Sequence, residues 1–110
     1  MTDTFEPAPF GIEVGRDGAT ATVAVLGELD ISTTPELTGA LAALEPGYET
    51  LVVDLSRCTF FASSGISILL EQSHRASEEG FELVVIKARP EVQRMFDLAG
   101  LEDKLTFRDP

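Results

Sequence analysis

The stretch LVVDLSRCTFFASSGI, residues 51–66, decides how this chain folds. It opens with Leu51-Val52-Val53, a short apolar run ending in Asp54, which is typical of a strand buried inside a partly parallel sheet. A loop over residues 58–61 then enters Ala62-Ser63-Ser64-Gly65, and a helix is expected from about residue 64 to residue 79. A buried strand that leads into a helix is the unit of an α/β sheet.

Toward the N-terminus, the pattern predicts an antiparallel hairpin followed by a helix. Residues 10–14 and 19–26 form the two strands around the turn Arg16-Asp17-Gly18, and Gly27-Glu28-Leu29-Asp30 leads out of the second. The helix begins within residues 32–36. Either Thr33 caps it together with Glu36, or Thr34 caps it with Pro35 at the first helical position. Its apolar face is expected to comprise Leu37, Ala40, Leu41 and Leu44, and Pro46-Gly47 stops it.

Toward the C-terminus, strands and helices continue to alternate. The inner face of the helix over residues 64–79 is expected to comprise Ile66, Leu69, Leu70, Ser73 and Ser77, with Gly80 as its terminator. A strand over residues 82–87 precedes a helix opened by Arg89-Pro90 and ended by Gly100, and residues 105–107 form a last short strand. The inner face of that last helix is expected to comprise Val92, Met95, Phe96 and Ala99.

This order predicts an α/β domain with a mixed, mostly parallel sheet, an N-terminal antiparallel hairpin and three or more packed helices. Residues 1–9 are expected to be a flexible tail and residues 10–110 the folded domain. Nothing in the sequence calls for an oligomer, so a monomer is expected.

Composition narrows the function. The chain has 110 residues, one cysteine and a formal net charge of −11. Such acidity argues against binding to nucleic acids or to anionic membranes, where basic surface supplies the affinity. Residues 1–9 lack the basic start and apolar stretch of a signal peptide, and the lone cysteine fits a reducing compartment, so a cytoplasmic protein is expected.

Enzyme motifs are missing from the sequence. It contains neither GxGxxG nor GxxxxGK[ST], and one His and one Cys do not make a usual zinc site. His74 is expected on the outer face of its helix and Cys58 in the core. No catalytic centre, cofactor or metal is therefore expected.

Three acids at expected strand ends deserve a separate test. Glu28, Asp30 and Asp54 would meet at one edge of the sheet, where they could hold a magnesium ion or act as acid and base. Each also has a structural alternative, because Asp54 can cap a turn and Asp30 can accept bonds from loop amides. A small hydrolase or nucleotide-binding protein built on Asp30, Asp54 and the serine loop is disfavoured for want of a general base near Ser63 and of phosphate-cradling glycines.

Ser63 stands where a helix begins. As an N-cap, its hydroxyl would satisfy a free amide of the first turn. The same position suits a phosphate, because those amides point outward and the helix dipole favours negative charge there. Both interpretations are compatible with the sequence.

Taken together, the motifs resemble a known family. The segments are Gly27-Glu28-Leu29-Asp30 with Thr33 and Pro35-Glu36-Leu37, LVVDLS at 51–56, FFASSGI at 60–66, and Arg89-Pro90, Val92, Phe96 and Gly100-Leu101. In this order and spacing they are similar to the anti-sigma factor antagonists, the small single-domain members of the STAS group in bacteria. The resemblance spans residues 10–107.

The resemblance implies a non-enzymatic regulator of transcription. In that family the unphosphorylated antagonist binds an anti-sigma factor that is also a serine kinase, which releases a sigma factor. Phosphorylation of a loop serine ends the interaction, and a phosphatase restores it. By position the acceptor is Ser63, with Ser64 as the alternative, and Asp30 and Gly65 lie near it.

Two points qualify what the resemblance implies. The family commonly has an acid before the acceptor serine, where this chain has Ala62. That departure suits the alternative of an unphosphorylated STAS scaffold in a sensory or lipid-transport assembly. Ile68 is expected to point away from the inner face, beside Glu71 and Arg75, and with Ser64 and Ser67 it is the expected partner-binding surface.

Overall fold

A mixed sheet of six strands lies at the centre of residues 9–110, the part of the chain that this computed structural model describes. The strands are β1 (Gly11–Asp17), β2 (Thr20–Leu29), β3 (Thr50–Asp54), β4 (Cys58–Phe61), β5 (Glu82–Ile86) and β6 (Phe107–Arg108). Their order is β1-β2-β3-β5-β6, with β4 paired to β2. The β1–β2 pair is antiparallel and the other pairs are parallel, so the expected hairpin and mixed sheet are confirmed.

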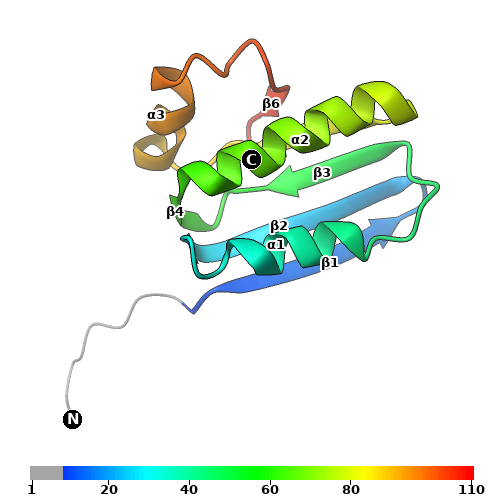
Figure 1. The fold of residues 1–110 in the computed structure, drawn as a ribbon, viewed down its shortest axis with the longest axis horizontal. Coiled ribbons are helices and arrows are strands. Elements are labelled where there is room, and N and C mark those ends of the chain that lie inside the picture. The colour runs from blue at the N-terminus through cyan, green and yellow to red at the C-terminus, as the bar shows by residue number, and fades with distance from the viewer. Residues whose placement is uncertain (1–8) are drawn as a thin grey trace.

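Three helices complete the fold of residues 9–110: α1 (Thr34–Ala42), α2 (Ser63–Glu79) and α3 (Pro90–Leu98). Figure 1 shows α1 and α2 side by side across one face of the sheet, while α3 lies at one end beside β4 and β6. Because β2 runs into α1, β4 into α2 and β5 into α3, the N-termini of all three helices gather at the carboxyl ends of the parallel strands. Within residues 9–110, no helix combines the length and the apolar character needed to cross a bilayer.

The core lies between the sheet and the helices. Its largest fully buried side chains are Phe61, Phe96, Leu29, Leu37, Leu51, Leu55, Leu69, Val23, Val25, Val53 and Val85. Val84 is also fully buried but lies outside this core, because it alternates along β5 with Leu83 and Val85. Each such side chain stabilises the fold by about 1.5–3 kcal/mol relative to its exposed state. The buried β3 predicted from Leu51-Val52-Val53 therefore lies where it was expected, between β2 and β5.

Two boundaries differ from the sequence prediction. Residues 58–61, expected to be a loop, form β4, because Gly27–Leu29 extend β2 far enough to pair with them. Thr33 is the N-cap residue of α1, but its hydroxyl caps nothing in the helix and instead accepts a hydrogen bond from Asp30 N at 2.9 Å. The capping box with Glu36 is therefore not formed.

Residues 1–8 of the expected tail lie outside the described residues.

The sequence pattern predicted the wrong residues for the inner face of α2. Its buried residues are Gly65, Leu69, Gln72 and Ala76. Ile66, Leu70 and Ser73 are half-buried, and Ser77 is exposed. Of the residues expected on the inner face of α3, Val92 and Phe96 are buried, but Met95 is half-buried and Ala99 is exposed beyond the helix. The buried stripe of α2 contains small and polar residues, so the apolar pattern did not mark it.

Gly65 allows α2 to pack directly against the strand ends. A Cβ atom there would lie 2.6 Å from Leu29 Cδ2 and 2.7 Å from two ring carbons of Phe61. Both neighbours are fully buried and have no room to move aside. A glycine is therefore required at this position by contact distance alone.

We expect Gly65→Ala to lower the free energy of unfolding by about 1–2 kcal/mol, because overpacking outweighs the gain in helix propensity. Urea unfolding followed by circular dichroism measures the change. Gly39→Ala in α1 is the matched control, because nothing lies within 4 Å of its Cβ position, and it should gain up to about 1 kcal/mol. Equal stability of the two variants would contradict the close packing at Gly65.

Candidate functional site

The serine loop joins β4 to α2 at the end of the sheet where the helices begin. Ala62 is the N-cap residue, with extended backbone angles of φ −71° and ψ 160°. Its N–H donates to Leu29 O at 2.8 Å, and its carbonyl accepts from Gly65 N at 2.9 Å. Ser63 is therefore the first helical residue rather than the N-cap, and the expectation that its hydroxyl caps the helix is wrong.

Ser63 presents a free hydroxyl to solvent. The residue is exposed, and within residues 9–110 its Oγ forms no hydrogen bond. Its carbonyl accepts a long bond of 3.4 Å from Ser67 Oγ one turn further along. The N–H groups of Ser63 and Ser64 have no acceptor among the described residues, as is normal for a first helical turn.

Ser64, in contrast, is part of a hydrogen-bond chain between two loops. Its Oγ lies 2.9 Å from Thr34 Oγ1, and Thr34 Oγ1 donates to Asp30 O at 2.7 Å. A hydroxyl has one proton, and the carbonyl of Asp30 can only accept, so Ser64 is the donor to Thr34. The Ser64 hydroxyl is thus half-buried and occupied, whereas that of Ser63 is free.

Asp30 organises the turn between β2 and α1. Its Oδ1 accepts bonds from Ser32 Oγ at 2.6 Å, Ser32 N at 2.9 Å and Thr33 N at 3.1 Å. These bonds, that of the Ser32 hydroxyl first, hold the pKa of the Asp30 carboxyl below its ordinary value. Because Thr34 connects this turn to Ser64, Asp30 and the serine loop are coupled through hydrogen bonds, although the Asp30 carboxylate forms no bond to Ser63.

The other sequence candidates do not assemble a metal site within the described residues. Asp54 accepts from Ser56 N at 2.9 Å and Ser56 Oγ at 2.7 Å, which is the turn-capping alternative. Within residues 9–110, no group of three His, Cys, Asp or Glu side chains is arranged to hold a metal ion. Cys58 is buried in the core, and its burial raises the pKa of the thiol. His74 is exposed on α2, as expected, beside Glu78.

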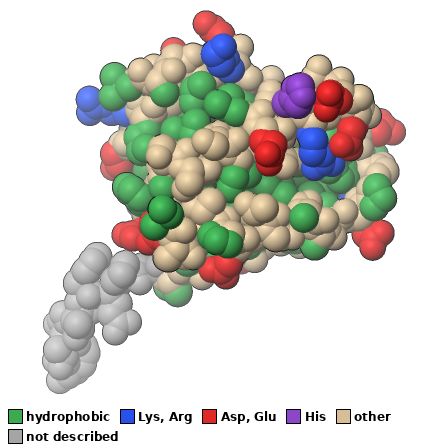
Figure 2. All heavy atoms as spheres, in the orientation of Figure 1, with side chains coloured by type: hydrophobic (Ala, Val, Ile, Leu, Met, Phe, Trp, Pro, Cys, Tyr) green, Lys and Arg blue, Asp and Glu red, His purple; other side chains and the backbone are tan. Residues whose placement is uncertain are grey.

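Ile68 is not the exposed residue that the sequence predicted. It is half-buried and packs against the core, in a hollow of about 350 Å³ between α1 and α2. Leu41, Tyr48, Glu71 and Arg75 line the same hollow. Figure 2 views this helix face and shows apolar side chains between the helices, with mostly acidic side chains around them. Ser67 is exposed, whereas Ser64 is half-buried.

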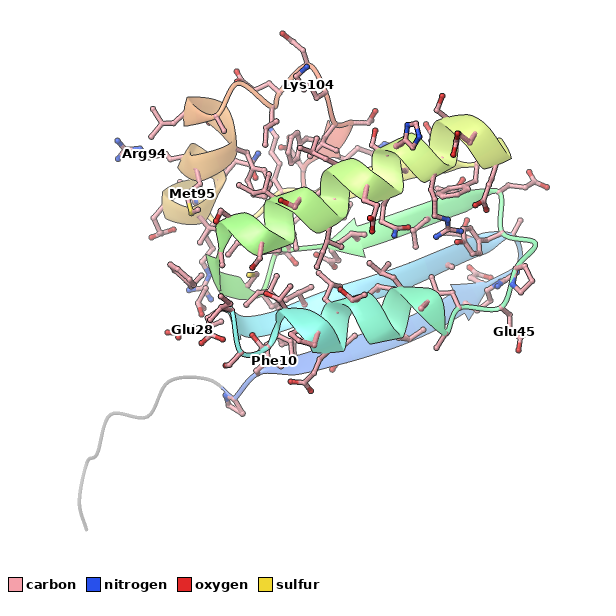
Figure 3. All side chains as sticks on the ribbon, viewed as in Figure 1. Phe10, Glu28, Glu45, Arg94, Met95 and Lys104 are labelled. Carbon is pink, nitrogen blue, oxygen red and sulfur yellow. The ribbon has the colours of Figure 1, made fainter. Side chains whose placement is uncertain are left out.

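Two exposed apolar side chains that the sequence analysis missed flank the serine loop. Phe60, in β4, is 45% exposed, and Ile31, in the turn after β2, is 83% exposed. Phe60 pairs with Glu28 in the β2–β4 ladder, and Glu28 lies at the end of the sheet where the helices begin (Figure 3). Strand alternation from the buried Cys58 would have placed Phe60 inward, because the shift in pairing register between Gly27 and Glu28 makes Thr59 and Phe60 both exposed.

The sequence of this chain is similar to those of known proteins. The family described as "Mlab, STAS domain" matches residues 12–107. A Staphylococcus aureus protein named anti-sigma-B factor antagonist is 28% identical over 82 residues, which cover 74% of this chain and 76% of that protein.

Solved structures give the same fold. The crystal structure of an anti-sigma factor antagonist from Mycobacterium paratuberculosis is 28% identical, with a TM-score of 0.75 over 93% of this chain and 87% of that one. The Bacillus cell fate determinant SpoIIAA in its phosphorylated form is 19% identical, with a TM-score of 0.66 over 91% of each chain. At that identity the second likeness shows the fold alone.

The bare N-cap of α2 leads to a stability prediction. Ala62 has the backbone conformation of an N-cap but no side chain that can accept a bond from the free amide of Ser64. We expect Ala62→Asp to raise the free energy of unfolding by about 0.5–2 kcal/mol through that bond and the helix dipole. Ala62→Asn is the control, because it caps without charge and should give a similar gain. Urea unfolding that shows no gain in either variant would contradict the assignment of Ala62 as the N-cap.

Proposed function

This chain belongs to the STAS domain family, and on that premise we propose that it is an anti-sigma factor antagonist switched by phosphorylation of Ser63. In the unphosphorylated state it binds an anti-sigma factor that is also a serine kinase, so that a sigma factor is released. The kinase then phosphorylates Ser63 and dissociates. A phosphatase removes the phosphate and restores binding. The chain acts in the cytoplasm as the substrate of these enzymes and has no catalytic role of its own.

The difference between two adjacent serines carries the proposal. Ser63 Oγ is exposed and free of hydrogen bonds within residues 9–110, so an attacking kinase can reach it and remove its proton. Ser64 Oγ donates its proton to Thr34 in a half-buried chain that joins two loops. Phosphorylation of Ser64 would break that chain, whereas phosphorylation of Ser63 leaves it intact.

The first turn of α2 can hold the phosphate that the switch requires. Ser63 and Ser64 offer free amides, and the positive end of a helix of 17 residues lies at the same point. Negative charge at a helix N-terminus is stabilised by these groups. The domain can therefore keep its fold after modification, which a reversible switch needs.

Release of the partner follows from what surrounds Ser63. Phe60 and Ile31 are exposed apolar side chains next to the loop and are natural contact residues for a partner. A phosphoserine carries nearly two negative charges, and burying it against an apolar contact without a cationic partner costs several kcal/mol. The modification therefore opposes docking at this surface without any change of fold.

One observation favours a second candidate, an unphosphorylated STAS scaffold in a larger assembly. Ala62 replaces the acid that the resemblance leads one to expect before the acceptor, and no carboxylate of the described residues bonds to Ser63. A scaffold would use the same surface around Phe60 and Ile31 but would be indifferent to the state of Ser63.

Paired baits distinguish the two candidates. Wild-type protein should capture a serine kinase of the anti-sigma type from the native host, and Ser63→Glu should lose it, because a carboxylate at the first position of α2 mimics part of the added charge. Mass spectrometry of the bound proteins is the measurement. The control Ser67→Glu places the same charge one turn further along, on another exposed serine. Retention of the same partners by all three baits would leave the scaffold as the better description.

Phosphate incorporation tests the choice of serine. With the captured kinase and labelled ATP, Ser63→Ala should lose at least about nine-tenths of the label, because it removes the only free hydroxyl of the loop. Ser64→Ala should remain a substrate, although breaking its bond to Thr34 should cost about 1 kcal/mol of stability. Full labelling of Ser63→Ala at this loop would instead identify Ser64 as the acceptor.

A further inference from the structure

A second hollow lies at the carboxyl ends of the strands, away from the serine loop. It has a volume of about 570 Å³ and sits where β3 and β5 end and α3 begins. Its lining includes Ser56, Lys87, Ala88, Arg89, Pro90 and Gln93 and no residue of the Ser63 loop. Ligands of open α/β sheets collect at this edge, and the volume is within the range of small-molecule sites.

Gln93 is a largely buried residue that offers an amide donor to this cavity. The residue is 8% exposed, and its Oε1 accepts a bond from Ala88 N at 3.2 Å, which fixes the side-chain amide. Its Nε2 has no acceptor within residues 9–110. No side-chain nitrogen or oxygen there is both fully buried and unpartnered, so Nε2 must reach open space, and the space that Gln93 lines is the cavity. This amide N–H group is therefore held in place and free to donate to a ligand in the cavity.

Two free cations stand around the same cavity. The chain has eight Lys and Arg residues against nineteen acids, yet three of the eight, Lys87, Arg89 and Arg94, line this cavity. Lys87 is paired with Asp109 at 3.4 Å, but within residues 9–110 Arg89 and Arg94 form no ion pair. Arg94 extends from α3 toward solvent in Figure 3 and so stands at the rim.

The remaining lining sets the character of the ligand. Of the acidic side chains of the lining, Asp109 is paired with Lys87, and Asp97 has no ion pair among the described residues. Pro110, the last residue of the sequence, also lines the cavity and adds a carboxylate. The guanidinium groups of Arg89 and Arg94 and the Gln93 amide therefore outnumber these acceptors in N–H donors, while the unpaired charges balance. Ala88 and Pro90 add an apolar wall. Donors on one side of an apolar wall suit a molecule with an anionic head and a compact apolar body.

We propose that the cavity between β3, β5 and α3 is a binding site for a small organic anion, a carboxylate or a phosphate ester, held by Arg89, Arg94 and the Gln93 amide. Such a ligand would make this acidic domain responsive to a metabolite at a surface separate from Ser63. The site is independent of the phosphorylation switch and can be tested on the chain alone.

Amide NMR spectra of the full chain, titrated with butyl phosphate or with pentanoate at constant ionic strength, test the proposal. At least one of the two should produce saturable shifts at Ala88 and Gln93, and its identity tells phosphate from carboxylate. Arg89→Gln and Gln93→Glu should each weaken binding about three- to tenfold. Gln93→Glu keeps the oxygen that accepts from Ala88 N and replaces only the NH2 donor by a carboxylate oxygen. The variant should therefore still fold.

Lys104→Gln is the matched control, because Lys104 is also a cation without an ion pair within residues 9–110 but lies outside the cavity lining. Its affinity for the anion should equal that of the wild type. The proposal is overturned if neither anion gives saturable shifts, if butanol gives the same shifts, or if Lys104→Gln weakens binding as much as Arg89→Gln.

Discussion

The contact between the first turn of α2 and the ends of β2 and β4 is the constraint on which the rest of the structure depends. Gly65 lets the helix approach until its backbone touches Leu29 and Phe61, where a single Cβ would come within 2.7 Å of both. The approach holds the carbonyl of Leu29 2.8 Å from Ala62 N and brings Ser64 within 2.9 Å of Thr34. One close contact thereby fixes the helix start, the strand pairing of β4 and the position of the turn before α1.

This contact explains why Ser63 and Ser64 have different roles. Because α2 packs closely at Gly65, the hydroxyl of the preceding residue, Ser64, faces Thr34 and links the two loops. Ser63 remains exposed to solvent. The fold thus separates the group that links the loops from the group that can be modified. The carboxyl of the half-buried Asp30, bound by Ser32 and Thr33, keeps the neighbouring turn ordered and forms no hydrogen bond to Ser63.

The sequence predicted the architecture because its strongest signals were periodic. The apolar run at 51–53, the Asp-Gly turn and the glycine after α2 gave the hairpin, the central strand and the helix end correctly. It failed where the packing is done by small or polar residues. Gly65, Gln72 and Ala76 form much of the buried stripe of α2, so the apolar pattern pointed to Ile66 and Leu70 instead and left Ile68 exposed. The positions of the site residues Thr34, Phe60 and Ile31 depend on the pairing of β4 with β2. A strand of four residues is too short to be recognised from its sequence pattern.

Charge alone does not explain how such a domain would be switched off. The chain already has a net charge of −11, so a partner drawn by acidity would be drawn more strongly after about two further negative charges are added. Long-range attraction and short-range contact must therefore act in opposite directions at Ser63. The apolar side chains of Phe60 and Ile31 resolve the conflict, because a contact that removes water from them also removes it from the phosphate. Desolvation is short-ranged and escapes screening by salt, so it can overcome the attraction that brings the two proteins together.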